Sequence, residues 1–207
     1  MGNTRKPNSV AYNIDCMEYM KTLPDKYFDL CIADPPYRDD NAPTQCMRKV
    51  ESNKKMFVAG APSEDMFNEI IRVSKEQIFF GANNYGRPFK GFVAWDKQIR
   101  GDVKYSHVEL ASLSEGLATI SRLCSIPCFN KGVKIHPTQK VVELYEWLLS
   151  KYAKEGWTIF DPFLGSGSSR IAAHKLGFDF VGCELDKDYF DAQEKRFNDY
   201  KSQLTLF

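Results

Sequence analysis

The chain has 207 residues, of which 43% are apolar, and 15 Phe and 10 Tyr among them are enough for one domain with a packed core. The formal net charge of +1 excludes nucleic-acid binding through the overall field of the molecule, so such a partner would need a local basic patch. No apolar run is long enough for a bilayer, and no signal peptide precedes the six cysteines. We therefore expect reduced thiols in a cytoplasmic protein with no membrane partner.

A metal site is not expected. Cys124 and Cys128 are separated by three residues, and His107 or His136 could join them as ligands. This spacing, without a second Cys pair, is not typical of zinc sites.

The first elements are short. Residues 12–16 indicate a strand that ends in an acid, and 17–23 indicate one or two helical turns before Pro24. Asp15 can cap that helix or can hydrogen-bond a ligand, and the two roles can coexist.

An unusual motif follows next. The apolar run 27–33 predicts a buried strand, and Asp34-Pro35-Pro36-Tyr37 stands at its carboxyl end. Two prolines hold the backbone rigid and extended and leave carbonyl groups outside a strand ladder. A fixed carboxylate, a free carbonyl and a ring face could together grip a planar amino group. The alternative is a Pro-Pro turn with a packing Tyr.

The middle of the chain is less regular. Residues 38–62 form a long polar connection, and a connection of this length is usually functional or mobile; the alternative is an ordinary solvated loop. Ser63 is expected to cap a helix to about residue 75, and strands are predicted at 77–81, 91–96 and 107–111. Segment 97–135 carries six basic and three acidic residues, which suits a nucleic-acid face or an ordinary irregular rim.

The second half alternates helices and strands. A helix is predicted from Thr138 to about residue 152, with His136-Pro137-Thr138-Gln139-Lys140 at its amino end, where an anion could bind. The plainer alternatives are capping for Thr138 and a solvated charge for Lys140. Strands at 156–163 and 178–184 flank a glycine turn and a helix at 170–176, and Asp186 is expected to cap a last helix to about residue 200.

This strand, glycine turn, helix and strand form a nucleoside-binding unit. Gly165 and Gly167 allow backbone to approach a ligand, and Glu184 is spaced to take ribose hydroxyls. Arg170 occupies the third glycine position of the dinucleotide fingerprint, so a nucleoside without a pyrophosphate, such as S-adenosylmethionine, fits better than a nicotinamide cofactor. The alternative is a tight turn in a sheet without a ligand.

Together these motifs resemble the β class of DNA amino-methyltransferases, which make N6-methyladenine or N4-methylcytosine. Asp34-Pro35-Pro36-Tyr37 matches the catalytic motif, and Phe163-Leu164-Gly165-Ser166-Gly167 matches the motif that binds S-adenosylmethionine. The segments 136–140 and 13–16 are similar to those near the methionine and adenine moieties of that cofactor.

The resemblance implies an α/β fold: a Rossmann-like S-adenosylmethionine-dependent methyltransferase sheet with helices on both faces and a circularly permuted motif order. It implies one domain over 9–207, with a mobile loop at 38–62 and a small inserted target-recognition region at 97–135. The catalytic residues would be Asp34, Pro35, Pro36 and Tyr37. The residues that bind S-adenosyl-L-methionine would be Asp15, Cys16, Asp34, His136, Thr138, Lys140, Asp161, Pro162, Phe163, Gly165, Ser166, Gly167, Ser168, Ser169, Glu184 and Leu185.

The resemblance further implies site-specific methylation of N6 of a flipped-out adenine in double-stranded DNA, as in restriction-modification, and it allows a homodimer. Adenine is preferred because Asp leads the catalytic motif, and cytosine N4 is the alternative. The motifs also leave open a methyltransferase for RNA adenine or protein glutamine, and a DNA-binding module without activity.

Overall fold

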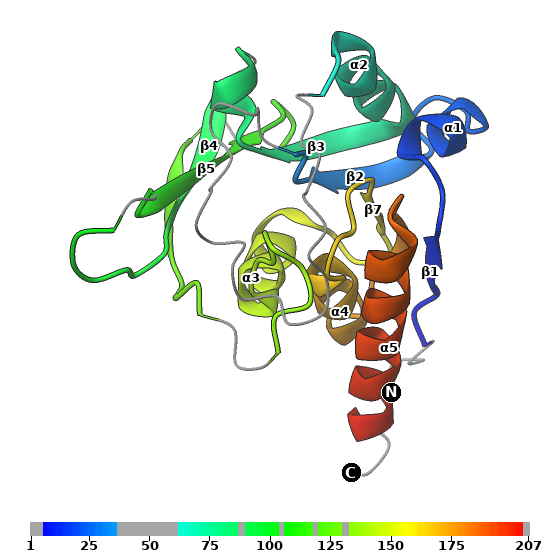
Figure 1. The fold of residues 1–207 in the computed structure, drawn as a ribbon. Helices are drawn as coiled ribbons and strands as arrows, with labels where there is room; N and C mark the ends of the chain where they lie inside the picture. The colour runs from blue at the N-terminus through cyan, green and yellow to red at the C-terminus, as the bar shows by residue number, and fades with distance from the viewer. Residues whose placement is uncertain are drawn as a thin grey trace.

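The computed structural model describes residues 6–36, 62–86, 90–103, 106–117, 120–129 and 133–204. These residues form one eight-stranded sheet in the order β1-β8-β7-β2-β3-β5-β4-β6, with helices on both faces (Figure 1). The first five strands in this order, β1, β8, β7, β2 and β3, pair in parallel. Strand β5 is antiparallel to its neighbours β3 and β4, and β6 is parallel to β4. The strands are Ser9–Tyr12 (β1), Phe28–Ala33 (β2), Ser74–Phe80 (β3), Gly91–Asp96 (β4), Val108–Leu113 (β5), Arg122–Ser125 (β6), Thr158–Asp161 (β7) and Asp179–Cys183 (β8).

Within these ranges, five α-helices cover the two faces of the sheet. Figure 1 shows α1 and α2 on one face and α3, α4 and α5 on the other. The helices are Cys16–Lys21 (α1), Glu64–Val73 (α2), Val142–Tyr152 (α3), Ser168–Lys175 (α4) and Lys187–Leu204 (α5), and Ala82–Tyr85 is a 3-10 turn after β3.

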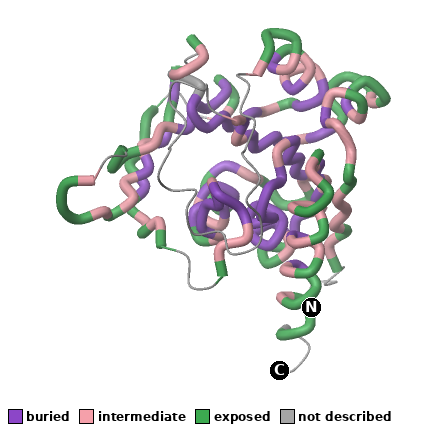
Figure 2. The backbone as a smooth tube through the Cα atoms, in the orientation of Figure 1, coloured by how far each residue is buried: buried purple, intermediate pink, exposed green. Residues whose placement is uncertain are grey.

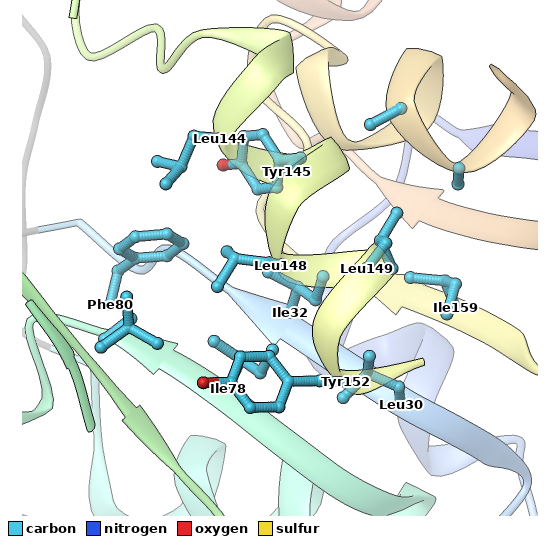
Figure 3. Close-up of a cluster of buried hydrophobic side chains, with 14 of the residues drawn as sticks. Leu30, Ile32, Ile78, Phe80, Leu144, Tyr145, Leu148, Leu149, Tyr152 and Ile159 are labelled. Carbon is cyan, nitrogen blue, oxygen red and sulfur yellow. The ribbon is translucent and has the colours of Figure 1, made fainter. Parts of the chain in front are cut away.

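Each face of the sheet has its own core. On one side, buried side chains of α1 and α2 pack against β2, β3 and β7, where the rings of Phe28 and Phe160 stack with centroids 4.4 Å apart. On the other side, Leu144 and Leu148 of α3 belong to one buried cluster with Ile32 and Ile78 of the sheet (Figure 3). Figure 2 shows burial concentrated in the sheet, α3 and α4, whereas much of α5 is exposed.

Several predicted elements agree with the structure. The strand 91–96 is β4, and the run 27–33 contains β2. Ser63 caps α2, because its hydroxyl accepts a hydrogen bond from the Met66 N–H. Asp186 accepts hydrogen bonds from the backbone N–H groups of Asp188 and Tyr189 at the start of α5.

Other predicted boundaries were wrong. The strand predicted at 12–16 ends at Tyr12. The capping role predicted for Asp15 is confirmed, because its carboxylate accepts a hydrogen bond from the Met17 N–H at 2.7 Å at the start of α1. The helix predicted to reach 75 ends at Val73, because the chain passes directly into β3. The strand β6, at the edge of the sheet, was not predicted.

The start of α3 was also misplaced. Thr138 does not begin a helix, since α3 starts at Val142 and has no side-chain cap. The segment 136–140 therefore precedes the helix by a few residues and does not form its amino-terminal anion site. Most of the predicted loop 38–62 lies outside the described residues.

In the described part of the chain, no helix combines the length and apolar character needed to cross a membrane.

We expect Leu148→Ala to lower the free energy of unfolding by about 2–5 kcal/mol, because this side chain of α3 is fully buried and its loss leaves a cavity. Leu176→Ala is the matched control, since Leu176 is 39% exposed and its truncation should change stability by no more than about 0.5 kcal/mol. Urea unfolding of both variants measures the difference. Equal losses would contradict the assigned core.

Candidate active site

Four acidic residues follow the carboxyl ends of neighbouring parallel strands. Asp34 follows β2, Asp161 ends β7, Glu184 follows β8, and Asp15 lies three residues beyond β1. Because β1, β8, β7 and β2 are adjacent and parallel, these residues gather at one edge of the sheet.

A cavity of about 740 Å³ opens at this edge. The predicted site residues that line it come from both halves of the chain: Asp15, Cys16, Asp34, Pro35, Pro36, His136, Thr138, Lys140, Pro162, Phe163, Gly165, Ser166, Glu184 and Leu185. Asp161, Gly167, Ser168 and Ser169 are buried behind this lining. Tyr37 lies outside the described residues.

The glycine turn between β7 and α4 is fixed by Glu184. Gly165 and Gly167 have positive φ angles of 51° and 72°, which favour glycine. The carboxylate of Glu184 accepts hydrogen bonds from the N–H groups of Gly165 and Asp186, both at 2.8 Å. Burial raises the pKa of Glu184 above its usual value, although these two bonds oppose the shift. The acid therefore holds the turn against the end of β8.

Asp161 supports the same turn from beneath. Its carboxylate accepts hydrogen bonds from the Ser169 hydroxyl at 2.5 Å and from the Phe163 N–H at 2.9 Å. Burial raises the pKa of Asp161 to about 7, because these two bonds only partly offset the desolvation of the charge.

The segment before α3 packs onto the glycine turn. The His136 ring lies 3.4 Å from where a Cβ on Gly165 would stand, and its centroid is 4.4 Å from that of Tyr189 on α5. Burial lowers the pKa of His136 to about 4, so the ring is neutral at neutral pH. The Thr138 hydroxyl lies 3.1 Å from His136 Nδ1 rather than capping a helix.

Lys140 connects the glycine turn to the Asp-Pro-Pro motif. Its carbonyl accepts a hydrogen bond from the Ser168 hydroxyl at 2.8 Å, and its ammonium donates to Asp34 Oδ2 at 2.5 Å. The Lys140 side chain is only 5% exposed, so the alternative of a solvated charge was wrong. The other oxygen of Asp34, Oδ1, is buried and has no hydrogen-bond partner among the described residues.

Three further residues adjoin this pair and were not selected from the sequence. Glu109 of β5 pairs with Lys140 at 3.2 Å and with Lys97, just beyond β4, at 3.1 Å. The hydroxyl of Tyr85 donates to the Pro36 carbonyl at 2.7 Å. The one signal in the sequence that could have drawn attention to Glu109 was a charged residue in a strand whose other residues, apart from Ser112, are apolar.

The charges of this cluster compensate one another. Burial lowers the pKa of Lys140, but the carboxylates of Asp34 and Glu109 outweigh it, and the net shift is upward. Burial raises the pKa of Asp34, and Lys140 opposes that shift. Within the described ranges, the site therefore offers a fixed buried carboxylate with one free acceptor. Among the described residues, no cluster of three or more His, Cys, Asp or Glu side chains is arranged to hold a metal ion.

Comparisons with known proteins all find similarity to methylases and methyltransferases. A family model for DNA methylases, N6_N4_Mtase, matches residues 94–195. YubD of Escherichia coli (strain K12) is 27% identical over 206 aligned positions, which cover 88% of this chain and 87% of that protein. The type II methyltransferase M2.DpnII of Streptococcus pneumoniae is 43% identical over 61 residues, 30% of this chain and 23% of that protein.

Solved structures support the fold. The M1.HpyAVI–SAM complex superposes with a TM-score of 0.59 at 22% identity, covering 90% of this chain and 98% of that one. The sheet, its covering helices and the glycine turn thus form an α/β fold similar to that of M1.HpyAVI. Residues 94–195, just under half of the chain, thus resemble the N6/N4 DNA methylase family.

The raised pKa of Asp161 predicts a pH dependence of stability. Between about pH 4 and pH 7 the folded chain keeps a proton on this carboxyl that the unfolded chain has lost, so this group makes the free energy of unfolding fall as pH rises. Relative to wild type, Asp161→Asn should therefore gain stability progressively across this window. Urea unfolding at a series of pH values measures the difference, and a difference that does not vary with pH would contradict the assignment.

Proposed function

We propose that this protein transfers a methyl group from S-adenosylmethionine to N6 of an adenine in double-stranded DNA. The observation that carries the proposal is that the Asp-Pro-Pro motif and the glycine turn open onto the same cavity. In the amino-acid sequence these motifs lie more than a hundred residues apart. The preference for adenine over cytosine rests on Asp34 at the head of the motif.

The residues around the glycine turn fit a nucleoside. The cavity volume of about 740 Å³ lies in the range of ligand sites. Asp15 and Glu184 offer carboxylate acceptors for hydroxyl groups, and Ile14 and Leu185 offer apolar side chains for the faces of a purine ring. Bound there, S-adenosylmethionine would supply an activated methyl group. The segment 136–140 would enclose its methionine portion.

The Asp-Pro-Pro motif fits the acceptor. The exocyclic amine of adenine is a weak nucleophile because its lone pair is delocalised into the ring. Asp34 Oδ1, which is buried without a partner among the described residues, would accept one N–H of this amine while Lys140 holds Oδ2. The Pro35 carbonyl would accept the other N–H, which favours a tetrahedral nitrogen. Asp34, whose pKa is raised by burial, is also placed to receive the proton that the amine loses.

DNA must approach this edge of the sheet, and its target base must leave the duplex to enter the cavity. The segment 97–135 contributes β5 and β6 to the sheet, so the proposal narrows target recognition to the connections around those strands. Arg100 and Phe129 are exposed in these connections, and Arg122 is exposed at the start of β6. In this proposal 9–207 forms one methyltransferase domain, with the acceptor motif ahead of the donor motif in the chain.

The proposal is tested by incubating the purified protein with unmethylated duplex DNA and S-adenosylmethionine labelled in the methyl group, followed by digestion to nucleosides and mass spectrometry. Labelled N6-methyladenine is the expected product. Labelled N4-methylcytosine would overturn the choice of base, and label only in RNA or protein supplied in parallel would overturn DNA as the substrate.

Asp34→Asn should reduce methyl transfer by roughly 100-fold or more, because the amide lacks the charge that holds the amine and receives its proton. Its affinity for S-adenosylhomocysteine should stay close to that of wild type, which separates loss of chemistry from loss of the fold. Near-normal turnover in this variant would refute the role of Asp34.

Glu184→Gln should weaken the binding of S-adenosylhomocysteine by roughly 10- to 100-fold, the range expected for lost hydrogen bonds to a charged group. Glu155→Gln is the matched control, because Glu155 is exposed in the turn before β7. Isothermal titration calorimetry measures both affinities. An unchanged affinity in Glu184→Gln would exclude this residue from the donor site.

A further inference from the structure

Four charged side chains form a continuous series of ion pairs from Asp34 to strands β5 and β4. Asp34 contacts Lys140, Lys140 contacts Glu109, and Glu109 contacts Lys97, at 2.5, 3.2 and 3.1 Å. Each of the four side chains is at most 16% exposed. They come from the end of β2, the segment before α3, strand β5 and the residue after β4.

Glu109 lies between the two lysines in this series of ion pairs. It pairs with the same Lys140 ammonium as Asp34 does, so the ammonium is held between two carboxylates, above the ring of Phe80 at 4.6 Å. An ammonium held by two carboxylates has less freedom to move than one held by Asp34 alone. Lys97 balances the charge of Glu109, so the four groups sum to zero.

We propose that Glu109 is a positioning residue for methyl transfer, which acts through Lys140 by holding the ammonium on Asp34 Oδ2 and so keeping Oδ1 as the acceptor for the target amine. Lys97 is the counter-charge that holds Glu109 in place. The inference rests on the proposed function and adds to it two residues, one in β5 and one just after β4, that do not line the cavity.

The charges predict opposite effects for the two outer residues. Among the described residues, the groups that act electrostatically with Asp34 include Lys140, Glu109 and Lys97, together with the carboxyl of Asp161 and the phenols of Tyr85 and Tyr145. Among them Glu109 raises the pKa of Asp34, and Lys97 lowers it. Removal of Glu109 should therefore make Asp34 more acidic, whereas removal of Lys97 should make it less acidic.

The test compares Glu109→Gln and Lys97→Gln in the full-length protein. Carbon-13 NMR of protein labelled at the aspartate carboxyl groups follows the titration of Asp34, which is assigned from Asp34→Asn. The Asp34 midpoint should fall by about one pH unit in Glu109→Gln and rise in Lys97→Gln, as expected for loss of one nearby charge of each sign. Glu115→Gln, which removes a glutamate that is 69% exposed, is the matched control.

The second measurement is the pH profile of single-turnover methyl transfer to DNA. The acid limb of this profile should move to lower pH in Glu109→Gln and to higher pH in Lys97→Gln. Glu109→Gln should also lower the maximal rate constant roughly tenfold, because the Asp34 carboxylate is misplaced. Glu109→Asp, which keeps the charge, should recover part of that loss. The affinity for S-adenosylhomocysteine should change by less than about twofold in each variant, because neither residue lines the cavity.

Shifts of the Asp34 midpoint in the same direction in both variants, or no shift in either, would overturn the inference. A loss of packing alone would not shift the midpoint in opposite directions according to the charge removed. Unchanged maximal rates with shifted midpoints would overturn the positioning role. The NMR titration needs no DNA substrate. An inactive wild-type protein would therefore contradict the proposed function, while the titration would still decide whether Glu109 and Asp34 are coupled.

Discussion

The buried ion pair between Lys140 and Asp34 is the interaction on which the site depends. A charge taken out of water is costly unless it is paired, and removal of one partner of a buried pair typically costs about 3–5 kcal/mol. The two residues are 106 positions apart in the chain. Because the Lys140 carbonyl also accepts a hydrogen bond from Ser168, the same residue brings the glycine turn and the Asp-Pro-Pro motif onto one cavity.

Sheet topology makes this meeting possible. The strands β8, β7 and β2 are adjacent and parallel, although β2 comes from the first quarter of the chain and the other two from the last. Their carboxyl ends therefore open at one edge whatever the order of the motifs in the sequence. The stacked rings of Phe28 and Phe160 fix β2 against β7, so the packing of the core sets the distance between the two halves of the site.

Local signals in the sequence were enough for much of the fold. Apolar runs located β2 and β4, and the side chains of Ser63 and Asp186 marked the starts of α2 and α5. The start of α3 was misjudged because Thr138 has the chemistry of a cap but lies near the His136 ring. The edge strand β6 was missed because only one of its four residues is buried, so it shows no apolar run.

In the candidate site, too, some residues could be predicted from local sequence and others could not. Motifs contiguous in the sequence, such as Asp34 to Pro36 and Phe163 to Gly167, could be found without coordinates because each carries its chemistry locally. The role of Glu109 could not be found in this way, because the two lysines Lys97 and Lys140 approach it from other elements and nothing in its neighbourhood in the sequence requires a lysine. The structure thus adds the charge balance: an acid chosen for its position after β2 depends on a lysine before α3, and that lysine depends in turn on a glutamate in the antiparallel part of the sheet. Such dependence is expected wherever a reactive carboxylate is buried, because its charge must be compensated by groups that the local sequence does not specify.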